Sequence, residues 1–472
     1  PTQSAPTGCT GVAVRPGDDI QAKLNGKPDG TVFCLAAGTY RMTTTLVPKT
    51  SQQLVGDASG PAILSGAKPV SAVKEGSYWV ITGQTTLGTS QFSGATTQCR
   101  PVNRVDPKGM CVYKDQVFLD DVSLWQVGSL AELSSGEFFW DYGANKIYLI
   151  NDPTGRKLER SVFGGQAIRA SYPGVTVRNL VIEKFGNGVQ SGSLSAGTNW
   201  NVIGNDVRLN HGGGIHQGPG TLLASNHIHH NGQLGIHGGQ ATCAAAKGLV
   251  AENNEIAFNN IAGYNWAWEG GATKWTHTDG LIARGNYVHD NYGVGLWTDA
   301  DNINVLYENN LVEDNHAEGI NHELSQRAII RYNTVRRNGF HHPTQGKAFG
   351  SGIFIDQSRD VEVYGNIVEL NNGGIAAVQE PAGTSCYGQE RETINLFVHD
   401  NTVRQQTGWA GGLQLLNEPD TGYYSRNNRW ENNTYYLGNL SSGLHFRWSS
   451  GDTTAATWRS FGHDDTGRFN SL

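Results

Sequence analysis

A repeat that starts with asparagine runs through the chain from about residue 175. Seven units begin with Asn-x-Val or Asn-x-Ile, at Asn205, Asn226, Asn254, Asn286, Asn310, Asn333 and Asn366. A second asparagine follows five residues later, at Asn210, Asn231, Asn259, Asn291, Asn315, Asn338 and Asn371. Glycine and a large residue come next, as in Gly214-Ile215, Gly235-Ile236, Gly263-Tyr264, Gly295-Leu296, Gly319-Ile320, Gly352-Ile353 and Gly374-Ile375. Looser units flank these at Asn179, Asn401 and Asn433, and the intervals run from 21 to 35 residues.

This period predicts an all-β solenoid in which each coil has three short strands, a parallel β-helix. Asparagine and glycine would occupy the corners, where the left-handed backbone region is accessible to them. Stacked asparagines at one corner would hydrogen-bond along the solenoid. A β-sandwich or a propeller is the alternative, but a propeller repeats at ~40–50 residues with four strands per blade.

The remaining sequence divides around this solenoid. Residues 19–26 predict a short helix that covers the first coil, residues 33–65 predict early coils, and residues 142–145 predict a hairpin turn. The tail, with Trp448, Trp458 and Phe461, is expected to cover the last coil. The predicted parts are a cap with first coils (1–69), a β-rich insertion (70–160), the main β-helix with the catalytic face (161–440) and a C-terminal cap (441–472).

Composition excludes several function classes. The 472 residues carry a net charge of −7, which argues against nucleic-acid binding. The sequence contains no run of 18 apolar residues, so no membrane-spanning helix is predicted. The first residues lack a basic stretch followed by an apolar one, so a signal peptide is expected to be absent or removed. The 62 glycines show no collagen period and indicate many turns.

The six cysteines favour a secreted protein with disulfides, because none forms a CxxC pair. Their sequence proximity favours the bridges Cys9–Cys34 and Cys99–Cys111. Cys243 and Cys386 lie far apart, and the sequence leaves open whether they pair or stay free. The sequence does not predict the oligomeric state.

Carboxylates recur at one position of three successive coils. Side chains alternate in a strand, so the second and fourth residues after the corner glycine point outward. These outward residues are Trp297 and Asp299, then Asn321 and Glu323, then Phe354 and Asp356. Neighbouring strands lie ~4.8 Å apart, so two such carboxylates would be about 5 Å apart, as in retaining glycosidases.

Stacked carboxylates repel, so one pKa should rise above the other. The protonated group would donate to a leaving oxygen, and the charged one would attack the anomeric carbon. Asp299 and Glu323 are the predicted catalytic pair, with Asp301 as a substitute for Asp299. Asp356 would adjust a pKa or hold a sugar hydroxyl. The alternative is a solvated acidic face or a calcium site.

Aromatic and polar residues near this column would contact a sugar, because aromatic faces stack on sugar rings. The candidates for sugar contacts are Trp266, Trp268, Trp275, His277, Trp297, Asn321, His322 and His237. Glu269, like Asp301, Glu318 and Asp356, is a candidate supporting carboxylate. His216 and His237 hold the equivalent outward position of earlier coils. Packing and turn-bonding roles are the alternatives for each of these residues. A metal site among His211, His227, His229 and His230 is a minor alternative, and neither a metal nor another cofactor is predicted.

The motifs GLWTDADN (295–302) and GINHELS (319–325) resemble carbohydrate-active parallel β-helix proteins, most of all the β-xylosidases of glycoside hydrolase family 120. The resemblance implies a right-handed β-helix, a carbohydrate substrate and a retaining mechanism, with Asp299 as nucleophile. In that family the acid/base Glu precedes an Asn-His pair. Here Asn321 and His322 lie between Glu318 and Glu323, so both glutamates remain candidates, and strand parity favours Glu323.

Three functions remain open at this point. The first is a secreted glycoside hydrolase that acts on a poly- or oligosaccharide. The second is a polysaccharide lyase or uronate epimerase, which would use a basic residue such as Lys274, Arg327 or Arg331. The third is a non-catalytic carbohydrate-binding β-helix, which needs no aligned carboxylates. The fold alone does not choose among them.

Overall fold

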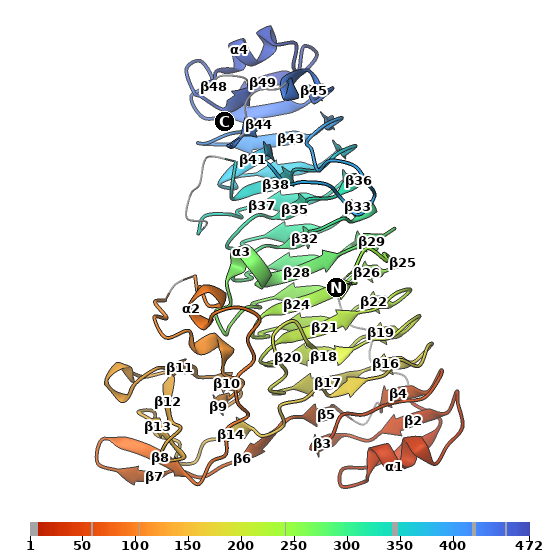
Figure 1. The fold of residues 1–472 in the computed structure, drawn as a ribbon, viewed down its shortest axis with the longest axis vertical. Coiled ribbons are helices and arrows are strands. Elements are labelled where there is room, and N and C mark those ends of the chain that lie inside the picture. Colours follow the sequence, from red (N-terminus) through yellow and green to blue (C-terminus); the bar gives the residue numbers. More distant parts are fainter. Residues whose placement is uncertain are drawn as a thin grey trace. The chain divides into compact units, whose positions relative to one another are not determined.

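The computed structural model describes residues 8–57, 60–102, 104–240, 242–341, 348–417, 422–448 and 451–472. The protein is mostly β, and its long parallel sheets form a right-handed β-helix (Figure 1), which confirms the predicted fold class. Contacts divide it into two compact units, of which the first comprises 1–217, 225–237 and 258–270 and the second 218–224, 238–257 and 271–472.

Helices are few and short in the described parts of both units. They are α1 (Ile20–Asn25), α2 (Ala95–Gln98), α3 (Trp266–Glu269), α4 (Ala455–Ser460) and the 3-10 turns Met110–Val112, Leu130–Glu132 and Tyr423–Ser425. Helix α1 confirms the helix predicted over 19–26. The Asp19 side chain accepts a hydrogen bond from the Ala22 amide (2.9 Å) at its start, and Ile20 and Leu24 are buried.

The first unit holds parts of three parallel sheets. One has β1 (Val12–Val14), β2 (Val32–Leu35), β4 (Gln53–Gly56), β16 (Thr176–Arg178) and β19 (Asn201–Ile203). The next has β3 (Gly38–Arg41), β5 (Ala62–Ser65), β17 (Leu180–Glu183), β20 (Asp206–Arg208) and β23 (His227–His229). The last has β15 (Ile168–Arg169), β18 (Gly192–Ser195) and β21 (Gly213–Gln217). Strands β2 to β5 confirm the early coils predicted for residues 33–65.

The second unit has the same three-sided plan. One sheet contains β22 (Leu222–Ala224), β26 (Val250–Glu252), β30 (Ile282–Arg284), β33 (Ile303–Glu308), β36 (Gln326–Arg331), β39 (Glu362–Tyr364), β42 (Phe397–His399) and β45 (Arg429–Glu431), with β25 (Ala246–Lys247) and β29 (Thr278–Asp279) beside it. Another contains β27 (Glu255–Ala257), β31 (Tyr287–His289), β34 (Leu311–Glu313), β37 (Thr334–Arg336), β40 (Ile367–Glu369), β43 (Thr402–Gln405), β46 (Thr434–Leu437) and β49 (Arg468–Ser471).

The third sheet of the second unit carries the predicted carboxylates. It contains β28 (Gly271–Thr276), β32 (Leu296–Thr298), β35 (Ile320–Glu323), β38 (Ser351–Asp356), β41 (Gly373–Gln379), β44 (Gly411–Leu415), β47 (Phe446–Trp448) and β48 (Gly451–Thr453). Strand β24 (Leu234–Gly239) crosses the boundary between the units. Inside the coils, β-branched residues stack in register, as Val312, Val335 and Val368 do, each with no exposed surface.

Buried asparagines form two ladders, which confirms the predicted stacking at the corners. In the second unit one ladder runs through Asn254, Asn286, Asn310, Asn333, Asn366, Asn401 and Asn433, and the other through Asn291, Asn315, Asn338 and Asn371. Asn310 is typical. Its Nδ2 donates to Asn333 Oδ1 and Ala283 O (both 2.9 Å), and its Oδ1 accepts from Asn286 N and Nδ2 (both 3.0 Å).

Most of the repeated glycines do not adopt the left-handed backbone region that the sequence predicted for them, although Gly263 does (φ 77°). Gly319 and Gly352 do not adopt the left-handed backbone region; residues just before the ladder asparagines do, including Tyr332 (φ 55°). A Cβ on Gly319 would lie 2.5 Å from a methyl group of Val335 and 2.7 Å from the Gly352 carbonyl oxygen. Glycine is therefore required here for close packing between coils.

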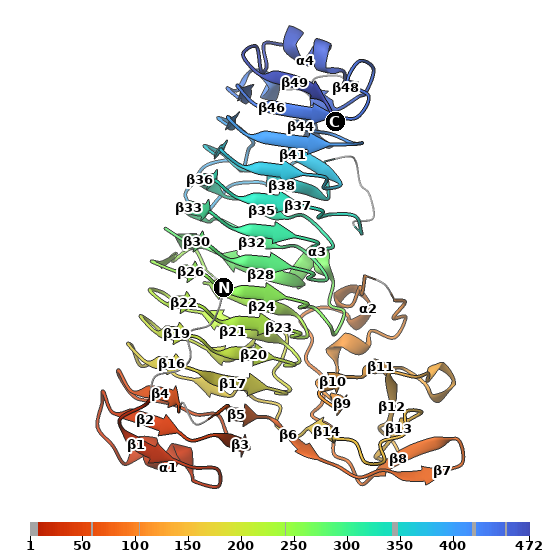
Figure 2. The same ribbon diagram turned by 180° about the vertical axis from the view of Figure 1, so that it is seen from behind.

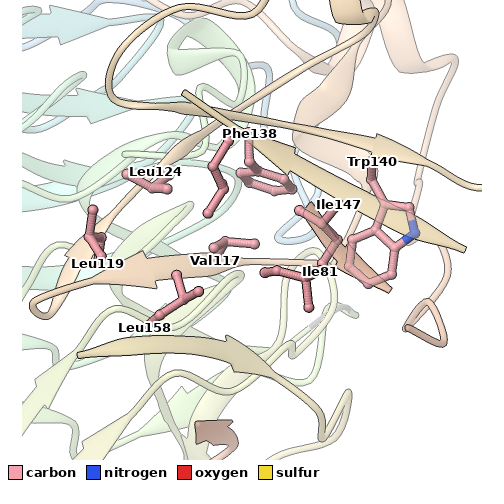
Figure 3. Packing of buried hydrophobic residues seen from close by; sticks show 9 residues of the cluster. Ile81, Val117, Leu119, Leu124, Phe138, Trp140, Ile147 and Leu158 are labelled. Carbon is pink, nitrogen blue, oxygen red and sulfur yellow. The ribbon is translucent and has the colours of Figure 1, made fainter. Parts of the chain in front are cut away.

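The first unit also contains the predicted β-rich insertion, a mixed region drawn in orange and tan in Figure 2. Its sheets are β10 (Val122–Ser123), β9 (Val117–Leu119), β14 (Leu158–Ser161) and β6 (Ala67–Pro69), and β11 (Trp125–Val127), β12 (Glu137–Asp141), β13 (Lys146–Leu149), β8 (Tyr78–Thr82) and β7 (Val73–Glu75). The antiparallel pair β12–β13 confirms the predicted hairpin. Figure 3 shows its apolar core, formed by Ile81, Val117, Leu119, Leu124, Phe138, Trp140, Ile147, Leu149 and Leu158.

Three disulfides connect all six cysteines. Cys9–Cys34 and Cys99–Cys111 are the two predicted bridges, and the pairing left open is Cys243–Cys386. The last bridge spans 143 residues of sequence, which only the coiling of the second unit brings together. No helix of the described residues is long and apolar enough to cross a membrane.

The C-terminal segment buries part of its predicted aromatic set. Trp458 is fully buried and Trp448 is 6% exposed, and the Trp458 indole donates to Asp464 Oδ2 (2.9 Å). Asp464 Oδ1 accepts from Asn433 Nδ2 (2.9 Å) and so ends the first ladder with a carboxylate. Phe461 is 45% exposed and is the C-cap residue of α4.

Replacing Asn310 by alanine should lower the free energy of unfolding by about 2–4 kcal/mol, because it leaves several buried amide and carbonyl groups without partners. Thermal or urea unfolding monitored by circular dichroism measures the change. Asn25→Ala, at an exposed position in α1, is the control and should change stability by less than about 0.5 kcal/mol. Equal effects of the two substitutions would contradict a structural role for the ladder.

Candidate active site

Backbone register places the predicted carboxylates on neighbouring strands of one sheet in the second unit (Figure 1). Thr298 pairs with His322, and Glu323 pairs with Asp356. Asp299 directly follows Thr298, so it lies level with Glu323. The residues that alternate with them, Thr298, His322 and Ile355, have no exposed surface. The parity argument therefore holds, and Asp299, Glu323 and Asp356 share the outer face of the sheet.

Lys274 lies at the centre of the contacts around Asp299. Its Nζ is 2.8 Å from Asp299 Oδ2, and the same Nζ lies over the indole of Trp297, 3.9 Å from the ring centroid. The Lys274 side chain is 5% exposed, whereas that of Asp299 is 18% exposed. The Asp299 carboxylate thus has a buried cationic partner and can still be reached from the surface.

Glu323 has an environment that favours its protonated form. Burial is the main cause that raises its pKa to about 8, and the charge of Asp299 adds to this. Lys274 and the hydrogen bond from Trp297 act in the opposite direction. The Trp297 indole nitrogen donates to Glu323 Oε2 (2.9 Å), and Asn321 Nδ2 donates to the same oxygen (3.2 Å). These two donors orient the carboxyl group.

Asp356 continues the column and is more deeply buried, at 5% exposure. Burial, followed by the charge of Glu323, raises its pKa well above the usual range. Its partner on the next coil is the apolar Val378. Its Oδ1 has no hydrogen-bond partner among the described residues, and the same holds for Oδ1 of Asp299 and of Asn321. Unused acceptors of this kind are typical of sites that bind a polar ligand.

Asp301 has a different role from the one predicted by parity. Strand β32 ends at Thr298, and Ala300 and Asp301 both adopt the left-handed conformation (φ 59°), so the alternation does not extend to Asp301. Its side chain is 1% exposed and forms an ion pair with Arg391 (2.6 Å), while His277 Nε2 lies 3.9 Å away. Asp301 therefore cannot stand in for Asp299, and His277 lies beside this ion pair.

Trp275 and His322 lie inside the coil rather than on its outer face. Both have no exposed surface, and Trp275 pairs in register with the interior residue Thr298. His322 Nδ1 is 2.8 Å from Thr298 Oγ1, and burial lowers the His322 pKa to about 3. Strand parity puts both side chains in the core, so a sugar on the surface would not touch them.

Glu318 and Glu323 differ in ways that bear on the choice of acid/base. Glu318 precedes strand β35, is 3% exposed, and its Oε1 accepts a hydrogen bond from the Gly350 amide (2.8 Å). Its charge contributes to the raised pKa of both Glu323 and Asp356, but it lies outside the strand and has no register partner on the outer face. Glu323 shares the outer face and the register with Asp299, so the geometry favours Glu323.

The remaining sequence candidates belong to the first unit, and each has local contacts there. Trp266 lies under the Arg100 guanidinium (5.1 Å), and Trp268 stacks on Phe92 (5.6 Å between centroids). Both tryptophans belong to α3, which ends at Glu269. The rings of His237 and His216 lie 4.9 Å apart at an angle of 48°. These two histidines line an open hollow of about 420 Å³ with Gln166, Arg169, Ala170, Ser171, Gln190, Ser191, Ser195 and Ala196.

In the described part of the chain, two groups of acidic, histidine or cysteine side chains lie as close together as metal ligands do, but their side chains are already bound to other residues. One is His277, Asp301 and Cys386, in which Cys386 is held in a disulfide. The other is Asp121, Glu159 and Glu183, whose carboxylates surround the Lys184 ammonium. Neither has the open donor set that a metal ion requires.

Lys274 is the site residue that sequence reasoning missed, since it was considered only as a scattered base. The sequence position of Lys274, directly before Trp275, could have revealed its orientation. Trp275 points inward, so Lys274 must point outward, one coil before Trp297. Arg391, which holds Asp301, lay 90 residues away in sequence and gave no such signal.

Comparisons with known proteins agree with this architecture. The sequence profile of a family described as "Right handed beta helix region" matches residues 187–346 and 267–390. A solved structure described as "The complex structure of XylC with xylose" is similar, with a TM-score of 0.61, 12% identity, and coverage of 96% of this chain and 82% of its own. No curated protein sequence matches this chain significantly.

Two further solved structures are similar at lower TM-scores. The mannuronan C-5 epimerase AlgE6 A-module of Azotobacter vinelandii has 14% identity, a TM-score of 0.48, and coverage of 96% of this chain and 94% of its own. A structure described as "Glycoside hydrolase" has 9% identity, a TM-score of 0.42, and coverage of 84% and 91%. The match to the XylC structure, at 12% identity, shows the fold alone, and the activity has to be inferred from the site.

The raised pKa of Glu323 predicts a pH-dependent gain of stability in Glu323→Gln. Between its unfolded value near 4.5 and about 8, the folded protein keeps a proton that the unfolded chain releases, so this group's contribution to stability falls as pH rises. Glutamine does not titrate, so Glu323→Gln does not lose stability with rising pH at this position. Its melting temperature relative to wild type should therefore be higher at pH 8 than at pH 4.

The control for this experiment is Glu431→Gln, because the Glu431 side chain is 52% exposed and pairs with Arg429 on another sheet. Its melting temperature relative to wild type should be nearly the same at the two pH values. The assignment of a raised pKa to Glu323 is wrong if Glu323→Gln also shows no such difference.

Proposed function

We propose that this protein is a secreted glycoside hydrolase that cleaves glycosidic bonds in a poly- or oligosaccharide with retention of anomeric configuration. One observation carries the proposal: a carboxylate held by a lysine, Asp299, lies level with a carboxyl group whose pKa is raised to about 8, Glu323. Two carboxyl groups whose environments separate their protonation states are the requirement for this reaction.

Each member of the pair has a distinct task in this proposal. Glu323 donates its proton to the leaving glycosidic oxygen, and Asp299 attacks the anomeric carbon to form a glycosyl-enzyme ester. Glu323, now charged, then takes a proton from the water that hydrolyses the ester. Neighbouring strands lie ~4.8 Å apart, which supports a carboxyl separation of ~5–5.5 Å, typical of retaining rather than inverting enzymes.

The surrounding residues support the pair. The Lys274 Nζ pairs with Asp299 (2.8 Å) and covers the ring of Trp297, whose indole NH donates to the Glu323 carboxyl. Trp297 is 3% exposed, so its role in the proposal is to orient Glu323 rather than to stack on a sugar. Asp356, with its raised pKa, provides a neutral carboxyl beside Glu323 that can bind a hydroxyl.

Two further findings are consistent with a carbohydrate substrate and export. A structural neighbour with the same fold was solved with xylose. Three disulfides suit an oxidising, extracellular environment.

Replacing either carboxyl group should abolish hydrolysis. In a screen of aryl glycosides and polysaccharides, Asp299→Asn and Glu323→Gln should each lower kcat/KM by at least about 1,000-fold, because each removes a group that acts directly on the reacting bond. NMR of the first product should show the anomer of the substrate. The control Glu431→Gln should keep full activity. Wild-type activity in both site variants, or an inverted product, would refute the proposed mechanism.

The pH profile offers a second test through Lys274. Because Glu323 must be protonated to act, kcat/KM should fall as pH rises above about 8. Lys274→Met removes the cation that lowers the Glu323 pKa, so the alkaline limb should move to higher pH while kcat decreases. An alkaline limb that stays in place in Lys274→Met would show that Lys274 does not interact with the acid.

The position of Lys274 also favours a second candidate, a polysaccharide lyase or uronate epimerase. A lysine beside acids on a β-helix face is what proton abstraction from a uronate would use, whereas Arg331 pairs with Glu308 on another sheet. A lyase would release an unsaturated product that absorbs in the ultraviolet, and an epimerase would exchange solvent deuterium into the polymer. Either signal without hydrolysis would replace the glycosidase assignment. Glycan binding without any turnover would support a non-catalytic protein.

A further inference from the structure

A histidine arrangement recurs at the surface of the β-helix. In β31 the ring of His289 stacks on Tyr287 (4.0 Å between centroids), and in β42 the ring of His399 stacks on Phe397 (4.0 Å). Each histidine contacts a carboxylate of the preceding coil through Nε2, and the aspartate that follows it in sequence through Nδ1. The pairs are His289 with Glu255 (3.4 Å) and Asp290 (2.8 Å), and His399 with Glu362 (3.1 Å) and Asp400 (2.7 Å).

Strand β23 in the first unit repeats this arrangement with two substitutions. His229 stacks on His227 (3.9 Å) instead of a tyrosine or phenylalanine, and its Nδ1 faces His230 Nδ1 (2.8 Å) instead of a carboxylate. The contact to the preceding coil is kept, since His229 Nε2 lies 3.0 Å from Asp206 Oδ1. His227 thus puts an imidazole where the other two arrangements have the Tyr287 or Phe397 ring. His230 puts an imidazole where they have the Asp290 or Asp400 carboxylate.

We propose that Asp206, His227 and His229 form a binding site for a zinc-like divalent transition-metal ion. One ligand atom from each of the three residues lies within 4.8 Å of the others. Zinc bonds to imidazole nitrogen and carboxylate oxygen are about 2.0–2.2 Å long, so small side-chain rotations bring the three atoms to one ion. Two imidazoles and one carboxylate, with an open fourth position, are a preferred donor set for Zn²⁺.

The neighbours of these ligands hold them in suitable orientations. Arg208 Nη1 lies 2.9 Å from Asp206 Oδ2, which leaves Oδ1 directed at His229, and Arg208 also pairs with Glu183 (3.0 Å). His230 contacts the far nitrogen of His229 and stacks on Phe258 (5.0 Å between centroids). A metal-bound histidine whose second nitrogen is hydrogen-bonded keeps its ring orientation and one tautomer. The ion would replace the proton between His229 Nε2 and Asp206 Oδ1.

The side chains are accessible from the surface. His229 is 14% exposed and Asp206 26% exposed, so an ion can enter without unfolding the coil. The site lies on the sheet that contains β20 and β23, whereas the candidate catalytic carboxylates belong to a different sheet of the second unit. The proposal is therefore independent of the proposed hydrolase activity.

The test uses the full chain, stripped of metal with a chelator and dialysed, and titrated with Zn²⁺ by calorimetry and by thermal unfolding. Wild type should bind one Zn²⁺ per chain at this site and melt at a higher temperature with Zn²⁺. His227→Phe copies the Phe397–His399 arrangement, so it keeps the stacked ring and loses one ligand. It should bind Zn²⁺ at least about tenfold more weakly.

Two more variants decide the site. Asp206→Asn should also lose at least about tenfold in affinity, while His399→Gln, at the equivalent position without a second imidazole, should bind as wild type does. The proposal is overturned if wild type shows neither heat of binding nor a shift in melting temperature. It is also overturned if His227→Phe and Asp206→Asn bind as tightly as wild type, or if His399→Gln weakens binding as much as they do.

Discussion

From Asn205 onward, buried asparagine side chains connect successive coils of this protein. An amide group is both a donor and an acceptor, so a column of asparagines can satisfy the backbone groups at a corner and each other in one continuous chain of hydrogen bonds. Asn310 shows this, with bonds to the coil before it and to the coil after it. Because a buried amide without a partner is costly, the ladders allow only one register between coils.

That register determines the chemistry of the outer face. Once the corners are aligned, residues at the same distance from a corner lie on neighbouring rungs, whatever the lengths of the loops between them. Asp299, Glu323 and Asp356 become neighbours although 24 and 33 residues separate them in sequence. Like charges at this spacing repel, and partial burial strengthens the repulsion. Lys274 offsets part of this repulsion at Asp299, and the pKa values of Glu323 and Asp356 are raised, which favours their protonated forms.

The same constraint lets one structural arrangement be reused for another purpose. Histidines stacked on an aromatic ring and held between two carboxylates stabilise the surface in two coils. In a third, His227 and His230 replace the ring and the aspartate, and the arrangement becomes a donor set suited to a metal. Each of the three histidines lies two residues before a ladder asparagine, Asn231, Asn291 or Asn401, although β42 belongs to a different sheet from β23 and β31.

The sequence by itself determined the repeat, the β-helix, the asparagine ladders, two disulfides and the column of Asp299, Glu323 and Asp356. Each follows from a local pattern with a fixed period, and strand alternation converts that period into direction. Only the tertiary structure decided the pairing of Cys243 with Cys386, the ion pair that removes Asp301 from the column, and the contact of Lys274 with Asp299. Those depend on where the left-handed residues bend the chain after a strand ends, and on which long loops meet. Neither the bends after strand ends nor the meeting of long loops follows a repeating pattern in the sequence.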